Sequence, residues 1–185
     1  MEEYPKPLLW EEKSKLRDIF KIFKRLAEIS DDRIMLNTRI FLLGSYSDKK
    51  IELWNISPKE ELDKLKLALN DLGNISAYLL QDFKDFLDID LINKFYVISK
   101  LSDYIFTLVE SDNKGFIVGI GHIIELGIIT AKKELAEKTY IFIRFGTKLT
   151  EMLSKGILKK HYLGTKAFFF ESVDELINLA INIVR

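Results

Sequence analysis

Five mainly apolar segments, separated by stretches with helical periodicity, are the feature that most restricts the fold of this chain. They are residues 39–43, 77–80, 104–109, 139–144 and 166–170. A strand that is apolar at successive positions is buried on both faces, and strands that alternate with helices indicate βαβ units around a parallel sheet. Right-handed crossovers place helices on both faces when the strand order is 2-1-3-4-5. The sequence therefore predicts an α/β three-layer sandwich of the flavodoxin or Rossmann-like class, with a five-stranded parallel sheet.

The helix starts carry their own signals. Ser57 and Ser172 are each followed three residues later by a glutamate, which is the pattern of a capping box. Further helices are expected near residues 93–101, 118–137 and 150–158, where apolar residues recur at helical spacing.

A separate amphipathic pattern precedes the first strand. Residues 1–36 are predicted to form a helical extension, followed by the flavodoxin-like part over residues 37–185, within a single structural domain overall. The apolar side of this N-terminal helix is formed by Leu16, Phe20, Phe23 and Ala27. The predicted sheet already has helices for both of its faces. The apolar side of the N-terminal helix must therefore be buried against another surface, and we expect a homodimer contact.

Composition excludes several classes of function. Lys plus Arg and Asp plus Glu both number 28, so no basic excess favours nucleic acid as a partner. Cysteine is absent and there are two histidines, which leaves no thiolate chemistry and no histidine-rich metal site. We therefore expect no metal and no cofactor, and any catalysis must use carboxylates, hydroxyls or lysines.

The chain begins without the pattern of a signal peptide, and no apolar run is long enough to span a bilayer. We expect a cytoplasmic protein without membrane contact. The single glutamine and the absence of cysteine are typical of thermophiles.

The predicted topology places a ligand crevice between the first and third strands, where the strand order reverses. Its two sides are the segments 44–48 and 110–121. This position suits a small molecule, and the topology does not identify which one. The candidate binding residues on these segments and at the start of the following helix are Gly44, Ser45, Tyr46, Asp112, Gly119, Gly121 and His122.

Glu125 is the candidate catalytic residue. Between Ile117 and Ala131 the only ionisable residues are His122 and Glu125, so this carboxylate is embedded in an apolar segment. Burial of an unpaired carboxylate is costly, and such a residue is paired, protonated or functional. Two readings stay open: a nucleophilic or sugar-binding carboxylate, and a glutamate satisfied by loop amides or by a buried Lys or Arg.

The order of motifs from Arg39 to Arg144 resembles the nucleoside 2-deoxyribosyltransferase-like superfamily. The resemblance rests on a glycine and Tyr46 after the first strand, on Ser102-Asp-Tyr-Ile-Phe-Thr-Leu-Val109, and on Gly121-His-Ile-Ile-Glu-Leu-Gly127. It implies that the ligand is a nucleoside or a nucleotide, that Glu125 attacks its anomeric carbon and that Tyr46 belongs to the sugar pocket.

The sequence departs from this family at its acids. An Asp stands six positions ahead of the nucleophile in the family, and here that place is Gly119, with Asp112 further back. The sequence therefore leaves two functions open: transfer or cleavage of an N-glycosidic bond, and a catalytically inactive module of the same fold that senses a ligand or binds a protein.

Overall fold

The structure is a computed structural model. It describes residues 37–52, 54–83, 91–112, 114, 117, 120–149, 154–155 and 166–185, with the backbone alone for residues 91, 93 and 120–124. The part from Thr38 to Arg185 forms a compact unit of its own. The expected N-terminal helix and its dimer contact lie outside the described residues.

The sheet confirms the predicted class and order. Its five strands are all parallel and lie in the order β2-β1-β3-β4-β5. They are β1 Thr38–Leu43, β2 Ile75–Leu79, β3 Tyr104–Val109, β4 Thr139–Arg144 and β5 Ala167–Phe170. The strand order reverses at β1, which has β2 on one side and β3 on the other.

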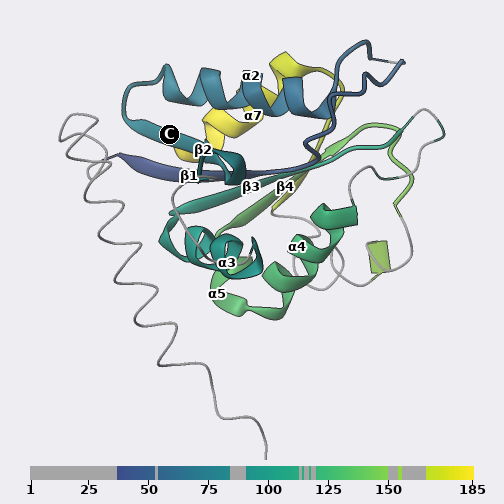
Figure 1. Cartoon of the computed structure of the whole chain (residues 1–185). Helices are drawn as coiled ribbons and strands as arrows, with labels where there is room; N and C mark the ends of the chain where they lie inside the picture. The colour runs from purple at the N-terminus through teal and green to yellow at the C-terminus, as the bar shows by residue number, and fades with distance from the viewer. Residues whose placement is uncertain are drawn as a thin grey trace, which may run out of the picture. The chain divides into compact units, whose positions relative to one another are not determined.

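Helices cover both faces of the sheet, giving three layers (Figure 1). On one face lie α2 Pro58–Asn70 and α7 Val173–Val184, and on the other lie α3 Leu91–Leu101, α4 Ile120–Ala131 and α5 Lys133–Ala136, while the short 3-10 helix η1 Leu80–Phe83 follows β2. No helix within the described ranges is long and apolar enough to cross a membrane. The helix expected near residues 150–158 falls almost wholly outside those ranges.

Both predicted capping boxes place their serines as expected. The Ser57 hydroxyl accepts a hydrogen bond from the Glu60 amide at 3.2 Å, and the Ser172 hydroxyl accepts one from the Glu175 amide at 3.2 Å. Each bond satisfies one of the amides that a helix start leaves without an intrahelical partner.

One expected helix, over residues 118–137, is wrong as a single element. It is interrupted at Lys132, whose backbone is extended (φ −116°, ψ 104°), so α4 and α5 are separate. The Thr130 hydroxyl donates to the Leu126 carbonyl at 2.7 Å, a side-chain bond that tends to bend a helix. The interruption lets α5 bury Leu135 and Ala136.

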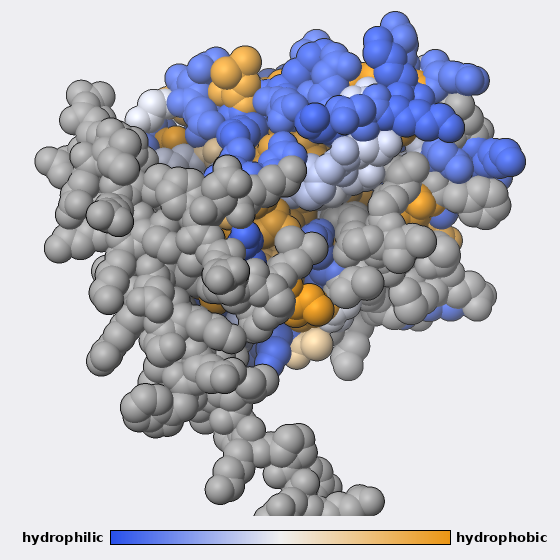
Figure 2. Space-filling view, in the orientation of Figure 1, coloured by the Kyte–Doolittle hydropathy of each residue, from blue (hydrophilic) through white to orange (hydrophobic). Residues whose placement is uncertain are grey.

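The larger core cluster lies between the sheet and the helices α2 and α7. Inward-facing residues of the strands meet leucines of α2 at helical spacing, and the outer side of α2 is charged. Figure 2 accordingly shows a mainly hydrophilic surface over α2. The fully buried members of this cluster include Ile40, Leu42, Leu62, Leu65, Leu69, Phe106, Phe142, Phe170, Leu176 and Ala180.

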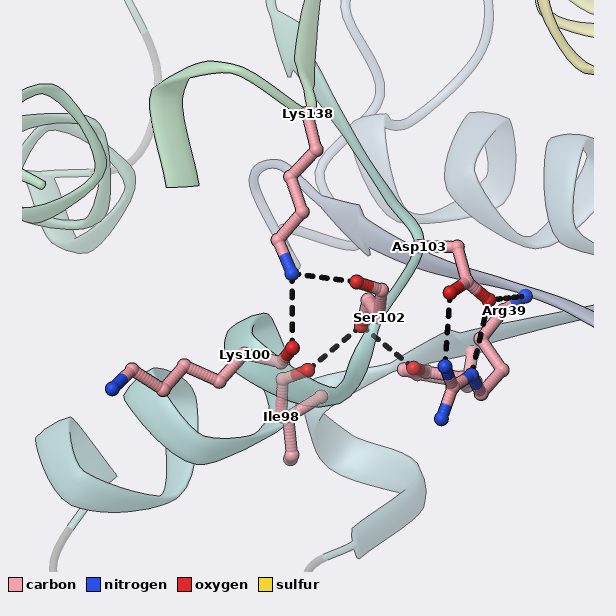
Figure 3. Close-up of polar contacts among 7 residues, drawn as sticks. Arg39, Ile98, Lys100, Ser102, Asp103 and Lys138 are labelled. Atoms are coloured by element: carbon pink, nitrogen blue, oxygen red, sulfur yellow. Dashed lines mark hydrogen bonds and ion pairs between the residues drawn. The ribbon is translucent and has the colours of Figure 1, made fainter. Parts of the chain in front are cut away.

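The amino edge of the sheet is held by polar contacts that involve backbone carbonyls (Figure 3). The Lys138 ammonium donates to the carbonyls of Lys100 and Ser102 at 3.0 and 2.6 Å, and so satisfies acceptors at the end of α3. Beside it, Arg39 donates twice to the carboxylate of Asp103, at 3.0 and 2.9 Å. These contacts join β1, α3 and β4 where the strands begin.

The outer edge of β2 is protected by one side chain of α2. Asn70 donates from its amide nitrogen to the Ala77 carbonyl at 3.2 Å, and its amide oxygen accepts from the Ala77 nitrogen at 2.7 Å. The side chain thus takes the place of a further strand, because an edge strand leaves such groups unpaired.

We predict that Asn70→Asp lowers the free energy of unfolding by about 1–3 kcal/mol, since the carboxylate keeps the acceptor but leaves the Ala77 carbonyl without a donor. The measurement is urea unfolding at neutral pH. Asn74→Asp is the matched control, because Asn74 is exposed and its hydrogen bond to Thr38 uses its backbone carbonyl. Equal stability of the two variants would refute the role given to Asn70.

Candidate functional site

The candidate site lies at the carboxyl edge of the sheet, where β1, β3 and β4 end side by side. Parallel strands all end at the same edge, and the segments that follow them form its surroundings. The segment between β1 and α2 stands beyond the end of β1, and α4 follows β3 (Figure 1). These are the elements that carry the residues expected to bind a ligand.

The segment after β1 holds three of the predicted binding residues. A Cβ on Gly44 would lie 3.2 Å from the Cδ1 atom of Leu62 and 3.4 Å from the Cβ atom of Leu108, so glycine lets α2 approach closely here. Ser45 is buried, and its hydroxyl accepts from the Ser47 amide at 3.4 Å. Gly44 and Ser45 therefore shape the chain in front of Tyr46.

Tyr46 and Glu125 interact electrostatically at the carboxyl edge of the sheet. The Tyr46 hydroxyl accepts a hydrogen bond from the Leu80 amide at 3.4 Å, which leaves its own proton available for donation. Burial, and then the charge of Glu125, raise the pKa of Tyr46 above its ordinary value of 10.0. Tyr46 therefore keeps its proton at physiological pH and offers a donor beside a half-buried carboxylate.

The structure describes the remaining predicted binding residues only in part. Gly121 and His122 lie in the first turn of α4, where the backbone alone is described, and Gly119 lies outside the described residues. The Asp112 carboxylate accepts from the Lys114 amide at 2.9 Å and so stabilises its own turn. The structure thus brings Tyr46 and Glu125 together and keeps Asp112 engaged locally.

A buried charged cluster at the same edge has no counterpart in the sequence prediction. The register of β3 and β4 pairs Leu108 with Phe142 and Val109 with Ile143, which brings Glu110 next to Arg144. Glu61, in the first turn of α2, faces the same point. The exposed fractions of Glu61, Arg144 and Glu110 are 0%, 1% and 2%, so all three ionisable groups are shielded from water.

Arg144 is the centre of this Arg144 cluster, which comprises Arg144, Glu61 and Glu110. Its Nη2 atom donates to Glu61 Oε1, and its Nε atom lies 3.5 Å from Glu110 Oε1. The guanidinium carbon lies 4.3 Å from the centre of the Trp54 ring and 5.0 Å from that of Phe170. One side chain thus joins α2, the ends of β3 and β4, β5 and the segment after β1.

Two carboxyl groups face a single guanidinium in the Arg144 cluster. Burial, followed by the neighbouring Glu61 carboxylate, raises the pKa of Glu110 well above its ordinary value of 4.5. A proton on Glu110 removes the excess negative charge. It also supplies a donor for Glu61 Oε2, which has no other hydrogen bond from the described residues.

Trp54 closes the Arg144 cluster from the segment after β1. Ile51 and Ile56 form an antiparallel bridge, and the amides of Trp54 and Asn55 both donate to the Ile51 carbonyl, at 3.1 and 2.8 Å. Asn55 has a φ of 51°, a left-handed conformation that asparagine tolerates well. This tight turn holds the half-buried Trp54 against Arg144.

The sequence did contain a signal for these residues. Glu110 and Arg144 continue the inward-facing positions of β3 and β4, and Glu61 lies on the apolar stripe of α2 together with Leu62 and Leu65. A charged residue at a position that periodicity assigns to the core requires a buried partner. Reading the three positions together would have indicated an ion cluster, although not its location beside Trp54.

Other features of the described part of the chain add no second site. Within it, no group of three or more His, Cys, Asp or Glu residues could hold a metal ion. Surface hollows of about 390 and 530 Å³ are lined by α2 residues with Asp48, and by Tyr96 with α5 residues. Their lysines are paired with neighbouring carboxylates or lie over the Tyr96 ring, and neither hollow is lined by Tyr46 or Glu125.

We predict that the free energy of unfolding of wild type falls as the pH rises, because Glu110 must ionise. The Glu110→Gln variant should lack this decrease. The folded state holds the Glu110 proton more tightly than the unfolded state, so this carboxyl stabilises the protein at low pH and loses that effect as pH rises from 4.5 through the raised pKa. The variant should match wild type at acid pH. Above that it should gain on wild type by up to about 1.4 kcal/mol per pH unit, the slope for one proton.

Urea unfolding of both proteins across the acid to mildly alkaline range measures this difference. Glu171→Gln is the control, because it removes an exposed carboxylate close to the same cluster. A difference between Glu110→Gln and wild type that does not change with pH would show that folding leaves the pKa of Glu110 unchanged.

Comparisons with known proteins identify no family for this chain. No protein-family pattern matches the sequence, and no curated protein matches it. Among solved structures, the metal-soaked Flv1 flavodiiron core from Synechocystis sp. PCC6803 is similar, with 11% identity and a TM-score of 0.46. The match covers 89% of this chain and 38% of that one.

Proposed function

We propose that this chain binds a nucleoside or nucleotide at the carboxyl edge between β1 and β3, and that Glu125 cleaves or transfers its N-glycosidic bond. The observation that carries the proposal is the buried Tyr46 hydroxyl, bonded to the Leu80 amide and within electrostatic reach of Glu125. They come from the segment after β1 and from the helix after β3, the two elements that flank the reversal in strand order. Ligands of open α/β sheets bind at this position.

The chemistry follows from the two side chains. The Glu125 carboxylate attacks the anomeric carbon, and the bond from that carbon to the base nitrogen breaks as the new ester bond forms. The base leaves with the electron pair and takes up a proton from solvent, and the water or second base that later replaces it gives up a proton in turn. Water or a second base then attacks the same carbon and frees Glu125, which returns to a carboxylate.

Tyr46 serves this reaction as a donor. Its raised pKa keeps the hydroxyl protonated, and the Leu80 amide occupies one of its lone pairs. The remaining proton can be donated to a sugar hydroxyl or to the carboxylate of Glu125. Such a contact orients the nucleophile and the sugar relative to one another.

A second candidate is a ligand-binding module of the same fold without turnover. Gly119 stands where the related enzymes carry an acid. Asp112, the nearest acid before it, is engaged with the amide of Lys114. This reading keeps the ligand site and removes the reaction.

We predict that Glu125→Gln leaves the fold intact and lowers release of base by at least about 10³-fold, because an amide cannot act as the displacing group. Wild type and variant are incubated with deoxynucleosides and nucleotides, and free base is followed by chromatography. Glu134→Gln, an exposed glutamate on α5, is the control and should retain activity.

The same panel is also tested for a shift of the thermal midpoint. A ligand held only by the native site, at 100 times its dissociation constant, adds about 2.7 kcal/mol of stability. A shift without release of base by wild type would favour the binding module. No shift with any compound would overturn the proposed function in both forms.

A further inference from the structure

We propose that Trp54 is the stacking platform for the base of the bound nucleoside or nucleotide, held in place by Arg144. The inference rests on the proposed function and names the part of the site that recognises the base.

Trp54 is positioned by two independent constraints. The turn between Ile51 and Ile56 fixes its backbone through hydrogen bonds to the Ile51 carbonyl. Its ring lies against the Arg144 guanidinium, with 4.3 Å between the ring centre and the guanidinium carbon. A large aromatic ring held in this way loses little further freedom when a ligand stacks on it.

Arg144 itself is immobilised by its neighbours. It is 1% exposed, donates to Glu61, lies close to Glu110 and contacts the ring of Phe170. Burial of this ion pair is costly and contributes little net stability. The arrangement does provide a rigid flat cation beneath one face of the indole.

Trp54 keeps part of its surface exposed to solvent. Trp54 is half-buried, whereas Ile51 and Ile56 on either side of it are 4% and 6% exposed. One face of the ring already lies against a cation, which makes the other face less attractive to a second cation and suits it to a neutral planar ring. Stacking on an aromatic side chain accommodates any nucleobase, because every base has a π-face.

The distance across the sheet suits a nucleoside. Arg144 ends β4 and Gly44 follows β1, with β3 between them. These strand ends are separated by two strand spacings, roughly 10 Å. A base on Trp54 therefore leaves its sugar to extend toward Tyr46 and Glu125.

Fluorescence tests the inference directly, because the chain contains two tryptophans and Trp10→Phe leaves Trp54 as the only one. In this background, deoxyadenosine and thymidine should change the Trp54 emission and protect it from quenching by acrylamide. The sugar 2-deoxyribose 5-phosphate, which has no base, should do neither. The thermal midpoint is measured on the same samples.

Substitution provides the second test. Trp54→Leu should weaken deoxynucleoside binding roughly tenfold or more, the effect of removing one stacking ring, while Trp54→Phe should retain most of the affinity. A purely structural role would instead lower the thermal midpoint of the ligand-free variants without changing affinity.

The outcomes separate the two proposals. A deoxynucleoside that raises the thermal midpoint while the Trp54 emission and its quenching stay unchanged would overturn the stacking role and leave the proposed function standing. A Trp54→Leu variant that binds as tightly as wild type would do the same. Absence of any thermal shift would overturn the proposed function and the inference together.

Discussion

The buried guanidinium of Arg144 is the interaction on which the carboxyl edge of this protein depends. A charge taken out of water costs several kcal/mol unless opposite charges and polarisable groups replace the water. Glu61, Glu110, Trp54 and Phe170 supply that replacement from four different elements. Glu61 supplies the opposite charge and the other three supply polar or polarisable groups, so the ends of β3, β4 and β5 are tied to α2 and to the segment after β1.

The two edges of the sheet are therefore held by different physical means. At the amino edge, Lys138 binds backbone carbonyls and Arg39 binds Asp103 in partly exposed positions, where each contact is modest and replaceable (Figure 3). At the carboxyl edge the Arg144 cluster is buried, and both of its carboxyl groups lie against the same guanidinium. The second arrangement restricts which conformations the adjacent segments can adopt, as a binding site requires.

The Arg144 cluster and the pair formed by Tyr46 and Glu125 lie on neighbouring strand ends. Tyr46 and Trp54 belong to the same segment, which is held near β2 through Leu80 and near β4 through Arg144. The position of Tyr46 relative to Glu125 thus depends on contacts at both ends of that segment. This connection gives the Arg144 cluster a role in the proposed site without direct contact between its buried carboxyls and a ligand.

The strands, the helix starts and the order of the sheet could be predicted from the sequence alone. The mainly apolar runs from Arg39 to Leu43 and from Tyr104 to Val109 lack the alternation of strands that have one solvent-exposed face. The serines at 57 and 172 mark helix starts through local hydrogen bonds. Both signals act within a few residues, and the parallel sheet with order 2-1-3-4-5 follows from them through the handedness of the crossovers.

Other features were decided by the tertiary structure. The interruption at Lys132 accompanies the hydrogen bond from the Thr130 hydroxyl to the Leu126 carbonyl and the burial of Leu135. No proline or glycine at this point of the sequence predicts it. The Arg144 cluster unites Glu61, Glu110 and Arg144 across 83 positions of sequence. By itself the sequence determined which residues enter strands, helices and core, because those preferences are local or periodic. Only the fold decided which buried charges meet, because pairing of distant groups depends on sheet register and helix placement.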